Sequence, residues 1–240
     1  SMENSLKEAE PKVELLYYTP EPEISCATAA RLCYSKVGIS ELRKKMSLED
    51  ARKLLRKIIS MGHFSALEHA IFTFGIEGVS RAMTHQLVRH RIASYNQQSQ
   101  RYVKLDEFSF IVPKTIKAKE ELYREYLGIM QKCHSFYNKL LNENIPAQDA
   151  RFVLPNACET KIVVTMNARS LYNFFEKRCC NRAQWEIRAV ANKMLELCKK
   201  VAPVLFEKAG PSCISKGVCY EGKMSCGMWK KVGAVLKEEH

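Results

Sequence analysis

Apolar residues recur every three or four positions along two long stretches of the chain, which is the spacing of one helix face. The first stretch predicts a helix over residues 117–142 with a buried stripe of Leu122, Tyr126, Ile129, Cys133, Phe136 and Leu140. The second predicts a helix over residues 182–201 that buries Ile187, Val190, Met194, Leu197 and Val201. Pro203 follows and is expected to end it. These two helices should organise the core.

Shorter helices are indicated by residues suited to helix ends. A helix is predicted over residues 47–61, because the Ser47 hydroxyl can cap its start together with Asp50 and because Gly62 can adopt the left-handed conformation that ends it. Asn167 is expected to cap another helix. Further helices are predicted over residues 24–34 and 80–89, with a short one from Pro146.

Short runs of apolar, aromatic and β-branched residues predict strands at residues 13–18, 70–76, 108–112 and 161–165. Residues 90–100 are rich in Ser, Asn and Gln and predict a loop. Strands mixed irregularly with long helices favour an α+β fold, with a mixed, mainly antiparallel sheet packed against the helices. We expect a single domain over residues 1–210 and a Cys-rich appendage over residues 211–240.

The composition is that of a globular protein. The 240 residues are 46% hydrophobic and include only 10 Gly and 8 Pro, which excludes collagen-like and disordered chains. No apolar run approaches the roughly 18 residues that a membrane span needs. The first residues carry acids and no apolar run, so no secretory signal is predicted. We therefore expect a cytoplasmic protein.

The ten cysteines are expected to be free thiols in a reducing compartment. Cys26, Cys33, Cys133 and Cys198 lie among apolar residues and are predicted to be core side chains. In the appendage, Cys213, Cys219 and Cys226 have spacings without a CxxC pair. A metal site or a disulfide there is the less favoured alternative.

The chain carries 38 Lys and Arg against 26 Asp and Glu, a net charge of +12. Residues 78–105 contain no acid at all. Within them Arg81, His85 and Arg89 recur every four residues and would share a helix face. Like charges so placed repel unless an anion lies between them, so this segment predicts an anion site. A solvated basic loop explains the pattern about equally well.

The neutral residues of this segment favour a nucleotide as the anion. Seven of them can donate hydrogen bonds to phosphate or to a base edge: Gln86, Ser94, Asn96, Gln97, Gln98, Ser99 and Gln100. The sequence has no GxGxxG, P-loop, GxSxG or HExxH motif. Phosphates would then be held by side chains and helix N-termini. His63, Glu68 and His69 fit no common metal-ligand spacing, so we predict no metal.

The segment Arg-His-Arg-Ile-Ala-Ser-Tyr-Asn-Gln-Gln-Ser-Gln-Arg, residues 89–101, carries a specific signature. It resembles the RHRxxSxNxxSxR motif of the flavin-dependent thymidylate synthases at every fixed position. Residues 62–69, 149–155 and 167–174 resemble three other elements of that family in the same order, and Arg178 falls where the family has another Arg. The resemblance covers roughly residues 18–203 and leaves out the Cys-rich tail.

The resemblance implies an enzyme that makes dTMP from dUMP, with 5,10-methylenetetrahydrofolate as carbon donor and NADPH as reductant through bound FAD. It also implies a homotetramer with active sites between subunits. The residues implied to contact FAD are Ser65, Arg89, His90, Arg91, Gln97, Asn167, Arg169 and Asn173. Those implied to contact dUMP are Gln86, Arg89, Gln97, Ser99, Gln100, Arg101, Arg151 and Arg178.

Arg178 is the expected catalytic residue, because a guanidinium beside the uracil N3 and O2 atoms would stabilise negative charge on the ring. Hydride would pass to the nucleotide without a protein nucleophile, and Ser99 is assigned to phosphate binding. Some family members carry Glu at position 97 and others have Gly at position 100, whereas this chain has Gln at both.

Two other functions fit the charge. A nucleic-acid-binding module would use the basic residues on phosphates, although no helix-turn-helix, RRM or zinc-finger pattern is present. A protein whose helices serve only oligomerisation would leave the basic segment without a ligand. Bound flavin in the purified protein would favour the flavin-dependent enzyme over both of these functions.

Overall fold

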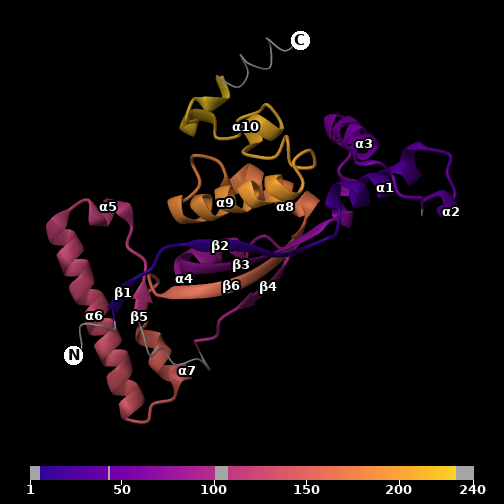
Figure 1. Ribbon diagram of the computed structural model, residues 1–240. Coiled ribbons are helices and arrows are strands. Elements are labelled where there is room, and N and C mark those ends of the chain that lie inside the picture. The colour runs from indigo at the N-terminus through magenta and orange to yellow at the C-terminus, as the bar shows by residue number, and fades with distance from the viewer. Residues whose placement is uncertain (1–5, 43, 101–107, 231–240) are drawn as a thin grey trace. The chain divides into compact units, whose positions relative to one another are not determined.

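A computed structural model describes residues 6–42, 44–100 and 108–230 (Figure 1). Contacts within the chain divide it into two compact units. The described residues of unit 1 are 6–12, 75–89, 95–100 and 108–163, and those of unit 2 are 13–42, 44–74, 90–94 and 164–230. Unit boundaries fall within four strands, at residues 12–18, 71–80, 94–97 and 159–167, so neither unit is a continuous piece of sequence.

Among the described residues, one sheet contains the strands β2 (Lys12–Tyr18), β3 (Ile71–Ser80), β6 (Glu159–Asn167) and β4 (Ser94–Gln97), in that order. Thr19, just after β2, donates its N–H to the carbonyl of Ile71 at the start of β3, so these strands are antiparallel. Thr73 faces Thr165, whereas Gly78 bonds to Glu159, so β3 and β6 are antiparallel as well. A second, parallel pair joins β1 (Leu6–Glu8) to β5 (Phe108–Phe110). The predicted α+β class with an antiparallel sheet is confirmed.

Strand β3 shows why the sheet has a covered face. Its residues alternate between buried and half-buried positions, with Phe72, Phe74 and Ile76 buried, as the period of two of a strand requires. The strand runs four residues past the predicted end. Near that end Gly78 has a φ of +68°, and a Cβ there would lie 1.8 Å from the carbonyl oxygen of Glu10. Only glycine allows the two backbone segments to approach so closely.

Unit 2 is largely helical. Its helices are α1 (Pro22–Tyr34), α2 (Ile39–Leu42), α3 (Leu48–Ser60), η2 (Ser65–His69), α8 (Ala168–Arg178), α9 (Trp185–Val201), α10 (Ser212–Ser215) and η4 (Gly222–Met224). The caps are the predicted ones: the Ser47 hydroxyl accepts from Asp50 N at 3.1 Å, and the side-chain Oδ1 of Asn167 accepts from Ser170 N at 2.8 Å. Gly62 has the expected left-handed φ of 72°.

An aromatic cluster forms much of the core of unit 2. The ring of Phe206 lies 5.2 Å from that of Phe72, 5.9 Å from Tyr172 and 6.3 Å from Phe175, all between ring centroids. All four side chains are buried. On α9 the predicted interior is correct for Ile187, Val190 and Met194, whereas Leu197 and Val201 are only half-buried.

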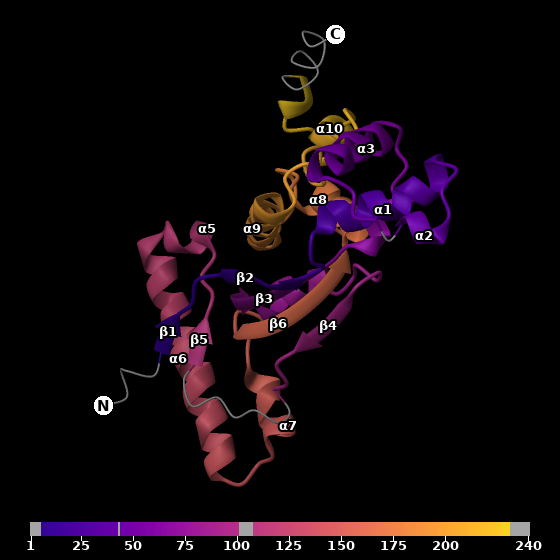
Figure 2. The same cartoon turned by 45° about the vertical axis from the view of Figure 1, so that its right-hand side comes forward.

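Unit 1 holds the longest described helix, α6 (Glu120–Asn142), together with α4 (Arg81–Leu87), α5 (Lys114–Lys117), α7 (Ala147–Ala150) and η3 (Arg151–Val153). Both ribbon views place α6 beside β1 and β5 (Figure 2). Met130 on α6 packs with Phe108 and Phe110, and the buried His134 ring stacks on Phe108 at 5.3 Å.

Half of the stripe predicted for this helix is wrong: Tyr126, Cys133 and Leu140 are half-buried, but its other three residues face solvent. Leu122, Ile129 and Phe136 are about half exposed, at 48%, 54% and 49%, whereas Met130 and Tyr137 are buried. The buried residues lie one position further along the chain. They include His134, which a search for apolar residues at helical spacing does not select. The helix also begins later than predicted, after a break at residues 118–119.

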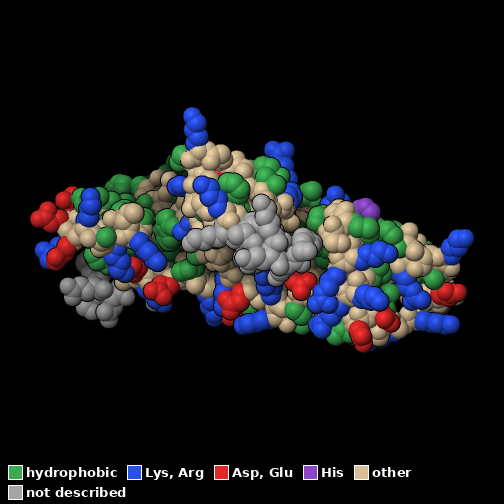
Figure 3. Space-filling model, turned by 90° about the horizontal axis from the view of Figure 1, so that it is seen from above, with side chains coloured by type: hydrophobic (Ala, Val, Ile, Leu, Met, Phe, Trp, Pro, Cys, Tyr) green, Lys and Arg blue, Asp and Glu red, His purple; other side chains and the backbone are tan. Residues whose placement is uncertain are grey.

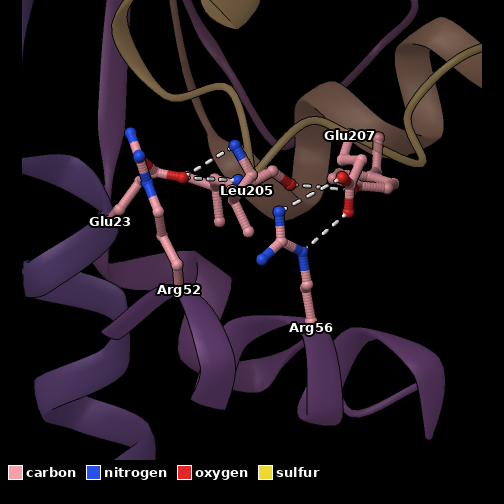
Figure 4. A network of polar contacts seen from close by, with 7 residues as sticks. Glu23, Arg52, Arg56, Leu205 and Glu207 are labelled. Carbon is pink, nitrogen blue, oxygen red and sulfur yellow. Dashed lines mark hydrogen bonds and ion pairs between the residues drawn. The ribbon is translucent and has the colours of Figure 1, made fainter. Parts of the chain in front are cut away.

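The carboxylate of Glu23 ties three segments of unit 2 together (Figure 4). It lies on α1, is only 3% exposed, and accepts hydrogen bonds from Val204 N at 2.8 Å and Leu205 N at 2.9 Å. The Nε of Arg52 on α3 donates to its other oxygen at 3.0 Å. A buried carboxylate with this many donors is well satisfied and fixes the segment after α9 against α1 and α3.

The tail beyond residue 210 packs on α8 within unit 2. Ser215 donates its hydroxyl to Glu176 at 3.0 Å, and Lys216 pairs with the same carboxylate at 3.0 Å. Cys213 is buried, whereas Cys226 is exposed and accepts from Asn181 Nδ2 at 3.6 Å. The limit between domain and appendage at residue 210 stays a prediction.

The ten cysteines are all unpaired. Cys26 and Cys198 are buried as predicted, Cys133 is half-buried, and Cys33 is exposed, so its assignment to the core is wrong. The helices in the described part of the chain are each too short or too polar to cross a membrane.

Cys226 is expected to be alkylated by iodoacetamide well before the buried thiols. Hydrogen bonds from Met228 N and Asn181 lower its pKa, and the thiolate is the reactive form. Burial raises the pKa of Cys26 and Cys158 to about 12. Mass spectrometry after brief labelling near neutral pH measures the order. Cys226→Ser should remove the fastest label and Cys33→Ser should not; a first label on Cys158 would contradict the assignment.

Candidate functional site

The predicted site residues divide between the two units. Unit 1 carries Gln86, Arg89, Gln97, Ser99, Gln100 and Arg151. Unit 2 carries Ser65, His90, Arg91, Asn167, Arg169, Asn173 and Arg178. Arg101 lies outside the described residues. The signature segment therefore contributes side chains to both units.

The polar segment predicted as a loop contains the strand β4, which pairs with β6. Gln98 N donates to the carbonyl of Lys161 at 2.9 Å, and the Tyr95 hydroxyl donates to the carbonyl of Leu87 at 2.9 Å. Ser94 and Asn96 are exposed, while Tyr95 and Gln97 are half-buried. Alternation of hydrophobic and polar residues could not reveal this strand, because the residues that form it are polar.

Gln97 fastens β4 to its neighbours in unit 1. Its Nε2 donates to the hydroxyl of Thr84 at 3.0 Å and to that of Thr160 at 3.2 Å, and both threonines are buried. The Thr84 hydroxyl in turn donates to the Arg81 carbonyl at 2.8 Å. A carboxylate at position 97 would lack the N–H groups that make these bonds. The amide thus suits the threonines that surround it here.

The basic residues on and after helix α4 are arranged differently from the prediction. Its start is capped by the Ser80 hydroxyl, which accepts from Met83 N at 3.0 Å. The helix ends at Leu87, so Arg89 lies beyond it and does not continue the face of Arg81 and His85. The expected three-residue cationic face is wrong, and Arg89 is exposed beyond the end of the helix.

Two further unit 1 candidates lie near the ends of short elements. Arg151 follows α7, and its Nε donates to the carbonyl of Gln148 at 3.1 Å. Gln100 lies near the buried thiol of Cys158, whose pKa is raised to about 12, chiefly by burial. Phe152, next to Arg151, is 83% exposed.

In unit 2, Arg178 and His90 are in direct contact although they are 88 positions apart in the sequence. Arg178 is the last residue of α8, and its Nε donates to His90 Nε2 at 3.1 Å. Burial, followed by the charges of Arg178 and Lys177, lowers the pKa of His90 to about 4. His90 is therefore neutral near pH 7 and carries its proton on Nδ1.

The short helix η2 is fixed to the start of α8. Ala168 N donates to the carbonyl of Ala70 at 2.8 Å, and Arg169 pairs with Glu68 at 3.1 Å. Nothing in the sequence spacing of Glu68 indicates that it pairs with Arg169. Ser65 at the start of η2 and Asn173 on α8 are exposed.

Four of the candidates keep their side-chain donors available to a ligand. Ser65, Arg89, Arg91 and Asn173 are exposed, and their side chains make no hydrogen bond or ion pair to another residue in the described ranges. Guanidinium and amide groups are suited to phosphate and carbonyl oxygens. No three His, Cys, Asp or Glu side chains of the described residues are arranged to hold a metal ion.

A cavity of about 680 Å³ lies elsewhere in unit 2. It is lined by α3 residues such as Arg56, by Glu207 and Lys208 after α9, and by the tail residues 214–217. None of the predicted site residues within the described ranges lines this cavity.

A family model described as "Thymidylate synthase complementing protein" matches residues 14–204. Among curated proteins, the flavin-dependent thymidylate synthase of Geobacter sulfurreducens is 57% identical over 95% of this chain and 98% of its own length. Those of Clostridium tetani and Pyrococcus furiosus are 53% and 48% identical, over 90% and 88% of this chain and 93% and 89% of their own.

A solved structure, the UMP/dUMP methylase PolB of Streptomyces cacaoi bound with 5-Br dUMP, has a similar fold. The TM-score is 0.74 with 24% sequence identity, over 85% of this chain and 95% of that one. At this sequence identity the comparison shows only that the two folds are similar. The family relationship rests on the sequence matches.

Proposed function

The chain belongs to the flavin-dependent thymidylate synthase family, and from that premise we propose that it methylates dUMP to dTMP. The observation that carries the proposal is the 57% identity to a relative of that name along nearly the whole chain. The exposed cationic and amide donors of the signature segment support it, because the nucleotide and the flavin are both anionic.

FAD is the proposed cofactor, and the side chains of unit 2 fit it. Asn167, Arg169 and Asn173 lie on the first turns of α8 or at its cap, and the contacts between Ala168 and Ala70 hold η2 with Ser65 beside them. Exposed guanidinium and amide donors suit a diphosphate and the carbonyl edge of a flavin ring. When bound, the flavin supplies the hydride.

The proposed nucleotide contacts are the unit 1 candidates together with Arg101 and Arg178. Arg89 and Arg151 would bind the phosphate with Ser99, and Gln86 and Gln100 would donate from their amides. Arg178 would stabilise negative charge on the uracil ring, since a guanidinium stays protonated and does not act as a base. Gln97 would act mainly by placing β4, because its amide nitrogen already bonds two threonines.

A homotetramer, NADPH, 5,10-methylenetetrahydrofolate and a cytoplasmic location complete the proposal. The net charge of +12 supports binding of several anionic ligands. The half-exposed Leu122, Ile129 and Phe136 on α6 and the surface position of the candidate donors support sites that are completed by another copy of the chain.

A nucleic-acid-binding module is the weaker alternative. On the face shown in Figure 3, Lys and Arg side chains are interspersed with acidic and apolar ones. A protein that follows a phosphate backbone concentrates its cations on one face or stripe.

The deciding experiment is a flavin absorbance spectrum of the purified protein. We expect bound FAD, bleaching by NADPH without oxygen, and reoxidation with dTMP formation when dUMP and 5,10-methylenetetrahydrofolate are added. Failure to retain flavin from excess FAD would refute the proposal. Tight binding of duplex DNA by a flavin-free protein would favour the alternative.

A further inference from the structure

The hydrogen bond between His90 and Arg178 joins a neutral ring to a cation. A cationic side chain donates to a histidine ring, at 3.1 Å between Nε and Nε2, where a carboxylate would be the usual acceptor. The ring is held by the buried Phe174, whose plane it meets at 83° with centroids 4.9 Å apart. The hydrogen bond joins His90 to Arg178, and the aromatic contact joins it to Phe174 on the same helix, α8.

This bond determines how the guanidinium is turned. The group is planar, so when Nε donates to a ring of fixed orientation, the directions of the two terminal amino groups are fixed too. Those amino groups are the ones that can face a planar ligand edge bidentately. We infer that His90 is a positioning residue for Arg178: its Nε2 accepts the hydrogen bond from the Arg178 Nε–H and so orients the guanidinium. This inference rests on the proposed function, since the orientation of Arg178 affects turnover only if Arg178 faces the nucleotide.

The charges around the ring keep it in the accepting form. Arg178 and Lys177, both on α8, oppose a proton on His90, and burial opposes it more strongly. A protonated ring would turn its own N–H toward a cation and break the bond. Because Nε2 is occupied, any flavin contact of His90 has to use Nδ1, which donates. The resemblance-based assignment of His90 to flavin is compatible with this division of the two ring nitrogens.

Three variants test the inference. His90→Phe keeps a ring against Phe174 but removes the acceptor, and it should lower kcat for dTMP formation by about 10- to 100-fold with little change in KM for dUMP. His90→Gln places an amide oxygen near the position of Nε2 and should restore most of the loss. His85→Phe, the same change at an exposed histidine on α4, should leave kcat unchanged.

Flavin absorbance and nitrogen NMR separate the possible failures. All three variants should retain flavin, and the wild-type His90 resonances, assigned by their loss in His90→Gln, should show a neutral Nδ1–H ring from pH 5.5 to 8. A wild-type kcat in His90→Phe, no rescue by Gln, loss of flavin as the main defect, or titration near pH 6.5 would each overturn the inference. If the wild type made no dTMP, the proposed function would fail, while the NMR result would still decide whether the contact exists.

Discussion

Arg178→Ala is expected to retain FAD and to lose dTMP formation by about 10²- to 10³-fold, the effect of removing one electrostatic donor from a transition state. The guanidinium lies at the end of α8, where His90 holds its Nε. Its removal leaves the proposed flavin-binding residues on the first turns of the same helix in place. Single-turnover rates of flavin oxidation and the ratio of flavin to protein absorbance measure the two effects separately.

Lys177→Ala provides the matched control for this prediction. Lys177 is the neighbouring cation on α8 and is exposed, so its loss changes the net charge equally and removes only the smallest of the three effects that lower the pKa of His90. Its turnover should stay within a factor of about two of the wild type, as for most exposed substitutions. Arg178→Lys should remain strongly impaired, because an ammonium lacks the planar fork that His90 orients. Normal turnover in Arg178→Ala would remove this residue from the mechanism.

Glu23→Ala is expected to lower the free energy of unfolding by about 3–5 kcal/mol, the cost of breaking a buried charged network from one side. The substitution leaves the buried N–H groups of Val204 and Leu205 without their acceptor and leaves Arg52 without its carboxylate. Urea unfolding followed by circular dichroism measures the change. Glu23→Gln should cost less, since its carbonyl oxygen can still accept from one of the donors.

An exposed ion pair near this buried network offers a control. Arg56 Nε and Glu207 Oε2 lie 3.3 Å apart (Figure 4), and both side chains are substantially exposed. Glu207→Gln should therefore change stability by no more than about 1 kcal/mol. Equal losses in Glu23→Ala and Glu207→Gln would show that burial does not set the strength of these contacts.

The parts of the fold governed by local signals could be predicted from the sequence. Ser47 and Asn167 cap helices because their short side chains reach the free N–H groups of the next turn, and this depends only on neighbouring residues. The buried face of α6 could not be predicted in this way. Two apolar lines run along that helix, and the choice between them depends on Phe108 and Phe110, which are distant in sequence.

The candidate site shows the same division. The motif identified its residues, but the sequence contained no sign that Gln97 would be anchored by Thr84 and Thr160 or that His90 would meet Arg178. These pairings arise from the register of β4 against β6 and from the position of α8, which are properties of tertiary structure. The roles of the site residues stay predictions.

Gly78 has a consequence for how freely this chain can vary. A side chain there would overlap the carbonyl of Glu10, and the positive φ would disfavour it even without that overlap. A library of all twenty amino acids at this position, selected for growth that requires thymidylate, should return glycine almost alone. The position would look as invariant as a ligand-binding residue, although what is conserved there would be only an empty space between two backbones.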